Sequence, residues 1–112
     1  MLTHDDVRAA ALAQPEAYEA SHFDVQDFRV NKKIFCTLHA DVSRAVLKFS
    51  PEDQHNLLDG DALQRPEDRW GLKGWTYLYY ERLDPARLPG LIRLAWATVA
   101  PKRLLKSGSQ AA

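Results

Sequence analysis

The sequence predicts an α+β fold, a two-layer sandwich in which an antiparallel sheet packs against helices on one of its faces. Two observations support this class. A capped helix is followed by three strand-like segments, and the last third of the chain joins one aromatic strand to an amphipathic helix. Because the strands are grouped instead of alternating strictly with helices, we expect antiparallel pairing.

The first helix is predicted by its start signals. Thr3 can act as the N-cap, Asp6 stands in the capping-box position, and Leu2 can pack against Val7. The helix should end before Pro15. Its apolar face is narrow and composed mostly of small residues, so we expect it to lie flat on the sheet.

A β-hairpin with cations at its tip is predicted next. Residues 24–30 and 34–40 tend to alternate apolar and polar side chains, and Asn31-Lys32 suits the tight turn between them. Residues 44–49 form a third strand. All three strands can therefore pair in sequence order.

The second half begins with a short helix. Ser50 is a suitable N-cap with Pro51 at the first helical position, and the helix should stop by Gly60. Residues 61–69 are polar and irregular, and we expect a loop that can hold one short strand. Residues 74–83 give the strongest strand signal of the chain.

The last helix should run from Arg87 or Leu88 to about Ala100, because its apolar residues recur at helical spacing. The 112 residues suffice for one domain, which we assign to residues 1–106, with a disordered tail at 107–112.

Strand parity divides the aromatic residues of the late strand. Trp75 and Tyr77 should face one way, and Leu78 and Tyr80 the other. Most of these rings are expected to pack in the core or at an edge. Trp70 precedes the strand in a glycine-flanked turn or wing, so it is the best candidate for a ring that stacks on a base or ligand.

The formal net charge is zero, but the charges are segregated. Residues 1–28 and 51–68 each carry six acids against one arginine, whereas residues 29–50 and 69–112 carry five and eight cations against one and two acids. Zero net charge argues against a strongly basic nucleic-acid clamp. A basic surface forms if the two cationic blocks lie side by side.

Seven residues of those blocks are candidates for nucleic-acid binding, the cations through phosphate contacts and the tryptophan through stacking. They are Arg29, Lys32, Lys33, Lys48, Arg69, Trp70 and Lys73. The alternative is that cations at hairpin tips keep strand edges soluble.

The chain resembles the MmcQ/YjbR family of small bacterial proteins over about residues 3–104. The resemblance is carried by Lys33 and Phe35, the run Lys48-x-x-Pro51 with Leu57-Leu58 behind it, Trp75, and the stretch from Leu91-Ile92 to Lys102. It implies a frataxin-like fold, described as a double-wing DNA-binding motif, whose wing tips would be residues 31–33 and 69–73. Two positions depart from the family pattern: Gly74 replaces a frequent histidine, and Ala95-Trp96 replaces a Ser-Tyr pair.

The resemblance favours a non-enzymatic DNA-binding protein whose binding is weak, salt-sensitive and little dependent on base sequence. The alternative is a protein- or small-ligand-binding module on the same scaffold. That alternative predicts a concave aromatic pocket around Trp70, Trp75 and Tyr77.

Other classes have little support. Cys36 is the only cysteine, which excludes an internal disulfide and a cysteine zinc site. A catalytic relay of His39, Asp41 and Ser43 requires a strand that continues past its expected turn. A metal site has little support, because His39 with Asp41, or residues 4–6, offer too few ligands.

The remaining expectations are negative or general. His22 and His55 are expected in loops or facing solvent. We expect no enzyme and no metal site, and a nucleotide cofactor is not indicated, because the sequence has no phosphate-binding glycine loop and no dinucleotide fingerprint. No export signal or membrane span is visible, so a cytoplasmic protein is expected.

Overall fold

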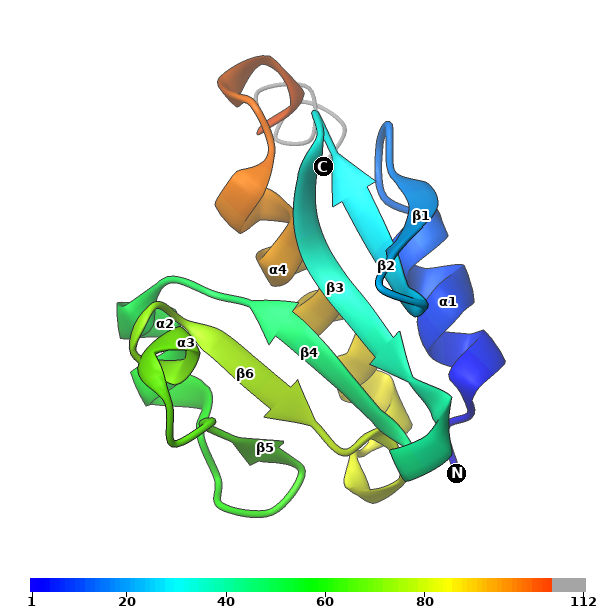
Figure 1. Ribbon diagram of the computed structural model, residues 1–112. Helices are drawn as coiled ribbons and strands as arrows, with labels where there is room; N and C mark the ends of the chain where they lie inside the picture. The colour runs from blue at the N-terminus through cyan, green and yellow to red at the C-terminus, as the bar shows by residue number, and fades with distance from the viewer. Residues whose placement is uncertain (106–112) are drawn as a thin grey trace.

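The computed structural model describes residues 1–105 and confirms the α+β class (Figure 1). Within these residues, one antiparallel sheet has the strand order β1-β2-β3-β4-β6-β5. Its strands are β1 (Tyr18–His22), β2 (Val25–Val30), β3 (Lys33–His39), β4 (Arg44–Lys48), β5 (Leu63–Gln64) and β6 (Trp75–Leu78). The helices are α1 (His4–Leu12), α2 (Pro51–Leu57), α3 (Arg69–Leu72) and α4 (Leu88–Val99), with 3-10 turns η1 (Ala40–Val42), η2 (Tyr80–Arg82) and η3 (Pro85–Arg87). The tail expected at residues 107–112 lies outside the described residues.

The helix α1 begins with the predicted capping box. Thr3 Oγ1 accepts a hydrogen bond from the Asp6 N–H at 3.2 Å, and Asp6 Oδ2 accepts one from the Thr3 N–H at 2.8 Å. Leu2 and Val7 are both buried, in agreement with the predicted apolar contact at this end. These caps satisfy two of the donors that every helix start leaves without a partner.

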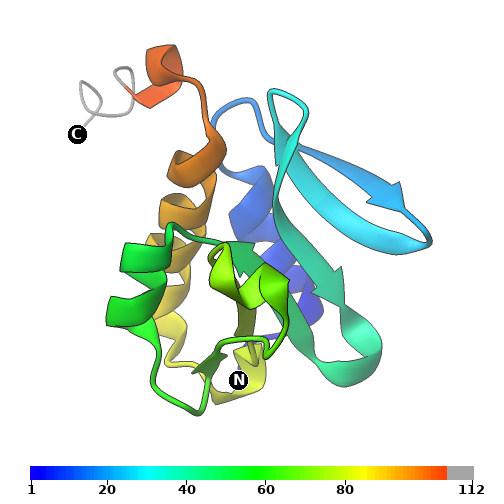
Figure 2. The same cartoon turned by 60° about the vertical axis from the view of Figure 1, so that its left-hand side comes forward.

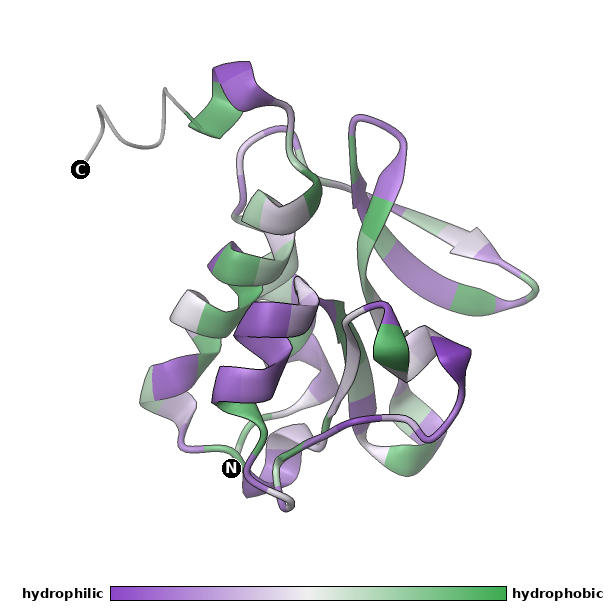
Figure 3. Ribbon diagram, turned by 90° about the vertical axis from the view of Figure 1, so that its left-hand side faces the viewer, coloured by the Kyte–Doolittle hydropathy of each residue, from purple (hydrophilic) through white to green (hydrophobic). Residues whose placement is uncertain are grey.

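The helix α4 forms the main cover of the sheet, packed against β3, β4 and α1 (Figures 1 and 3). Its bounds match the prediction, and its hydrophobic positions face the strands. The buried side chains of α4 are Leu88, Leu91, Ile92, Ala95 and Trp96. The indole N–H of Trp96 donates to the Pro15 carbonyl at 3.0 Å, which ties α4 to the chain that follows α1.

The predicted β2–β3 hairpin is confirmed. Asn31 and Lys32 adopt φ angles of 51° and 67°, as the tight turn requires. One irregularity follows, because Phe28 pairs with Cys36 and Arg29 pairs with Ile34, leaving Phe35 as an extra residue. This bulge allows the consecutive side chains of Phe35 and Cys36 both to be buried.

The edge strand β1 was not predicted. Its sequence, YEASH, is mostly exposed and lacks alternating large apolar residues, so only its pairing with β2 defines it as a strand. Its turn also lacks the usual signal. Phe23 and Asp24 have φ angles of 49° and 63°, where asparagine or glycine is normally preferred, and the Phe23 side chain is 96% exposed.

The aromatic strand is shorter than predicted, and the residues before it form a helix where a flexible turn was expected. β6 ends at Leu78 and η2 follows, so a strand reaching residue 83 was wrong. The stretch expected as a flexible turn is the short helix α3, whose start is capped by Asp68 Oδ1 accepting from the N–H groups of Trp70 and Gly71. The short strand expected in residues 61–69 is β5.

Candidate ligand-binding pocket

The sheet face opposite α1 and α4, called here the open face, carries a pocket. Strand register places five side chains in one row across it, because directly paired residues share a face. That row is Asp27, Thr37, Val46, Tyr77 and Gln64. The pocket has a volume of about 440 Å³, and α3 lies over this side of the sheet, away from α4 (Figure 2).

Three aromatic residues form the main wall of the pocket. Trp75 and Tyr77 come from β6, and Trp70 comes from α3 and is 54% exposed. Parity therefore divides the late strand as predicted, since Thr76 and Leu78 are fully buried on the covered face.

Each of the three rings has a cation over it. The contacts to the ring centroids are Arg44 to Tyr77 at 4.2 Å, Lys48 to Trp75 at 5.6 Å and Lys73 to Trp70 at 5.1 Å. In such cation–π contacts the electron-rich face of the ring attracts the cation and holds it beside an otherwise apolar surface. The pocket wall is therefore aromatic, with a cation against each ring and Arg44 itself among the lining residues.

A buried carboxylate forms part of the pocket's support. The Asp27 side chain is fully buried, its Oδ1 accepts from Arg29 Nε at 2.8 Å, and its Oδ2 lies 2.7 Å from His22 Nδ1. Burial alone would raise the pKa of Asp27, but the hydrogen bonds from Arg29 and His22 outweigh burial and lower it. Asp27 is thus ionised at neutral pH. With Nδ1 engaged, His22 can reach a ligand through Nε2.

A second polar group lies on β3 and β4. Thr37 Oγ1 lies 3.1 Å from His39 Nε2, and both residues line the pocket. Burial and the positive charge of Arg44 lower the pKa of His39, which keeps its ring neutral at pH 7. Arg44 Nε is inaccessible to solvent and has no acceptor among residues 1–105. A buried donor without an acceptor costs about 1 to 3 kcal/mol.

The position of α3 is fixed by close backbone packing. The side-chain amide of Gln54 donates to the carbonyls of Gly71 and Trp75, each at 2.9 Å. A Cβ atom at Gly71 would lie 2.0 Å from the Pro66 carbonyl oxygen, so only glycine allows this approach. Because α3 carries Trp70, these contacts also place one wall of the pocket.

The structure brings some predicted site residues together. Lys48 and Lys73 meet beside Trp75 and Trp70, at a site called here the pocket end, where Lys48 Nζ donates to the Lys73 carbonyl. The lysines contact these two lining rings but are not lining residues themselves. Partial burial and then the charge of Lys73 lower the pKa of Lys48. Arg69 is exposed in the first turn of α3.

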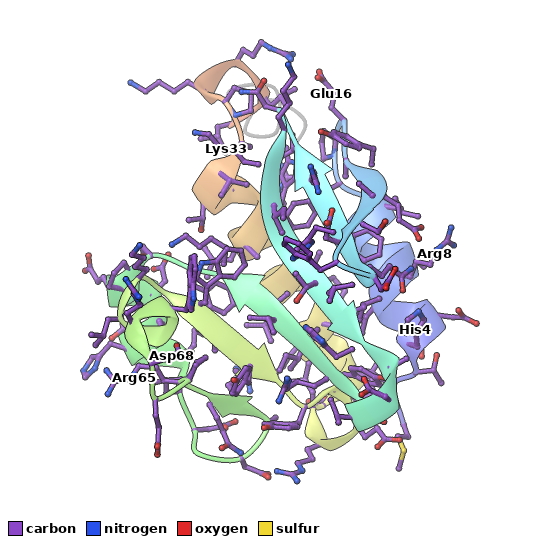
Figure 4. All side chains as sticks on the ribbon, in the orientation of Figure 1. His4, Arg8, Glu16, Lys33, Arg65 and Asp68 are labelled. Atoms are coloured by element: carbon purple, nitrogen blue, oxygen red, sulfur yellow. The ribbon has the colours of Figure 1, made fainter. Side chains whose placement is uncertain are left out.

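Other predicted residues lie apart from that group. Arg29 is engaged with Asp27, so its charge is partly neutralised. Lys32 and Lys33 lie at the tip of the β2–β3 hairpin, and the labelled Lys33 lies in the upper part of Figure 4, apart from Arg65 and Asp68, which lie lower on the left beside α3. The two proposed wing tips therefore do not adjoin one another.

Several pocket residues were not identified as candidates from the sequence. They are His22, Thr37 and His39, which line the pocket. The supporting ion pair of Asp27 with Arg29 was not predicted either. His22 was expected to face solvent or lie in a loop; it ends β1, with 37% of its side chain exposed. The alternation in β2 places Asp27 on the open face, but its partners depend on β1, which the sequence did not reveal.

The structure also bears on the metal-binding, membrane-spanning and catalytic alternatives. No cluster of three or more metal-ligating side chains occurs within residues 1–105. In the same range, no helix has the length and apolar composition needed to cross a membrane. The Cys36 thiol is fully buried, which strongly raises its pKa, and it faces away from His39. Asp41 lies in η1, beyond the end of β3.

The sheet order, the covering helices and the open face define a known class of α+β fold. The profile of the YjbR family matches residues 12–98, and the chain therefore belongs to that family. A solved structure of Deinococcus radiodurans protein DR2400, which contains a DUF419 domain, is similar with a TM-score of 0.70 and 21% sequence identity. The similarity covers 86% of this chain and 77% of that protein, and it establishes the fold. No curated protein matches the chain significantly.

Proposed function

We propose that this chain is a non-enzymatic binding protein whose ligand occupies the pocket on the open face. The observation that carries the proposal is the pairing of Trp70, Trp75 and Tyr77 with a cation each. A cation held against one part of a ring leaves other ring surface for a planar ligand, and it adds positive charge beside the ligand.

The dimensions of the pocket support the same conclusion. A volume of about 440 Å³ lies within the 300 to 1,000 Å³ typical of sites for small ligands. Such sites combine apolar walls with a few polar groups that fix orientation, and here Thr37, His22 and His39 can act in that way. The sequence-based alternative, an aromatic pocket around Trp70, Trp75 and Tyr77, agrees with this geometry.

The test uses the three tryptophans of the chain as reporters. Indole and naphthalene-1-sulfonate, two planar probes, are titrated into ¹⁵N-labelled protein while the indole N–H resonances are recorded. We expect the Trp70 and Trp75 signals to shift and the Trp96 signal to stay, because Trp96 is fully buried and bonded to Pro15. A Trp70→Ala variant should bind more weakly. Probes that move no pocket signal at millimolar concentration would contradict the proposal.

DNA is a second candidate ligand, supported by the meeting of Lys48, Lys73 and Trp70 at one end of the pocket. Phosphate contacts predict weak binding that falls steeply with salt. Fluorescence anisotropy of a labelled mixed-sequence duplex measures this across a salt series.

Two variants separate the two cationic regions. Lys73→Glu changes the pocket end, and the double variant Lys32→Glu, Lys33→Glu changes the hairpin tip. Loss of binding in both would support a role for both wings, and loss in Lys73→Glu alone would assign DNA to the pocket end. Absence of binding at low salt would contradict a DNA role and leave the small-ligand proposal intact.

A further inference from the structure

We infer that the ligand of the open-face pocket is a nucleotide unit, with its base against the indole rings and its phosphate at Arg44. This inference rests on the proposed pocket function and specifies its ligand class. It draws on three features of the pocket: its ring surface, the cations held against its rings and the Arg44 guanidinium among its lining residues.

The ring surface suits a flat heterocycle. Trp70 is more than half exposed although it is a large aromatic residue, and Trp75 is partly exposed on the sheet beside it. Stacking of a base on an aromatic side chain contributes about 1 to 3 kcal/mol per base. His22 and Thr37 add hydrogen-bonding groups on the opposite wall, where a heterocycle has nitrogen and oxygen atoms to pair and a hydrocarbon ring has none.

The charge around the pocket suits an anion. Arg44, Lys48 and Lys73 are cations held against its rings. The acids are already engaged: Asp27 is bonded to Arg29 and His22, and Asp68 accepts the N–H groups at the start of α3. Arg44 and Asp68 are the charged side chains that line the pocket itself, and Lys48 and Lys73 add positive charge against two of its rings.

Arg44 identifies where the anionic group belongs. Its guanidinium is held over Tyr77, its Nε is shielded from solvent, and no oxygen of residues 1–105 accepts from that N–H. A guanidinium binds phosphate through two parallel hydrogen bonds, and because Arg44 lines the pocket while its Nε is shielded, its terminal N–H groups are the ones that a phosphate there would contact. His39, which pairs with Arg44 across β3 and β4, can donate its ring N–H to the same group.

The experiment compares four ligands by isothermal titration calorimetry and by the same indole resonances: adenosine 5′-monophosphate, adenosine, inorganic phosphate and a five-nucleotide single-stranded DNA. We expect the monophosphate to bind about 10- to 100-fold more tightly than adenosine, as a charge-assisted contact allows. Arg44→Gln should abolish this difference. Arg82→Gln is the matched control, because Arg82 lies 4.8 Å from the ring of Tyr79 outside the pocket and should leave binding unchanged.

The outcomes separate this inference from the proposed function. Adenosine binding as tightly as its monophosphate, or equal loss in Arg44→Gln and Arg82→Gln, would overturn the nucleotide assignment and leave a planar-ligand pocket. Planar probes binding where none of the four ligands does would have the same meaning. Failure of every ligand and probe would reject both proposals.

The arms also distinguish the source of the nucleotide. Tighter binding of the single strand than of the monophosphate, still dependent on Arg44, would indicate a nucleotide presented by nucleic acid. Equal or weaker binding of the single strand would indicate a free nucleotide. Trp70→Ala is a second variant to be tested with each ligand. Because the Trp70 side chain is exposed, replacing it should leave the fold intact, which circular dichroism can verify.

Discussion

The two faces of the sheet are built from alternate residues of the same strands, yet they differ in composition and burial. On the covered face, Phe28, Cys36, Leu47 and Leu78 are each fully buried. On the open face, the neighbouring positions include a buried carboxylate, a paired threonine and histidine, and aromatic rings that remain partly exposed. Hydrophobic burial accounts for the covered face.

Hydrophobic burial does not account for the open face. Replacing a buried ion pair by well-packed apolar residues is often neutral or stabilising, so Asp27 and its partners are not needed to hold a sheet together. The shielded Nε of Arg44 costs stability outright. The comparison therefore teaches that one face is organised for folding, whereas the other carries polar groups and exposed rings that folding does not require, which supports the binding role proposed for it.

The largest expected effect is on the free energy of unfolding, and it contrasts one tryptophan on the covered side of the sheet with one on the open face. Trp96→Ala removes a fully buried ring from the covered side and should lower the free energy of unfolding by about 4 kcal/mol. Trp75→Ala removes a partly exposed ring from the open face and should cost about 1 kcal/mol. Urea unfolding followed by circular dichroism measures both.

Because about 4 kcal/mol is a large share of the total stability of a small domain, Trp96→Phe provides a milder variant if Trp96→Ala does not fold. Its expected cost lies between those of the two alanine variants. If Trp75→Ala were as damaging as Trp96→Ala, the open face would be a second core and the contrast between the faces would be lost.

The covered side could be predicted well from the sequence, because its signals are local. The capping box at Thr3 and Asp6, the Asn31-Lys32 turn and the spacing of apolar residues in α4 depend on neighbours a few positions away. Strand parity alone puts Trp75 and Tyr77 on one face, so the aromatic part of the pocket was among the alternatives, but the sequence did not decide which face of the strand is covered.

The polar part of the pocket could not be predicted, because it depends on register and on an unrecognised strand. His22 reaches Asp27 only because β1 pairs with β2, and the turn between them has Phe23 where a typical turn residue was needed as a signal. The bulge at Phe35 changes which residues of β3 face the pocket. α3 was likewise hidden, since its four residues include a glycine.

A smaller effect is expected from the buried carboxylate of the open face. Asp27→Asn keeps the size of the side chain but removes the charge that Arg29 and His22 contact, and it should cost about 2 kcal/mol at pH 7. This value lies below the 3 to 5 kcal/mol typical of fully buried pairs, because Arg29 and His22 are 26% and 37% exposed. Urea unfolding gives the difference from wild type.

The lowered pKa of Asp27 determines how the stability difference between wild type and Asp27→Asn changes with pH. The pKa of Asp27 is lower in the folded protein than in the unfolded chain, where it is about 3.9, so its contribution is fully present above that value. As the pH falls, the unfolded chain binds a proton at Asp27 first, and the stabilising contribution of Asp27 begins to decrease. It is lost once the pH has fallen through the folded pKa. The gap between wild type and Asp27→Asn should therefore be constant from pH 7 to 5 and shrink below about pH 4. A gap that stayed constant down to pH 2.5 would show that titration of the Asp27 carboxylate does not set the stability difference, and it would contradict the charge-based role given to Asp27 here.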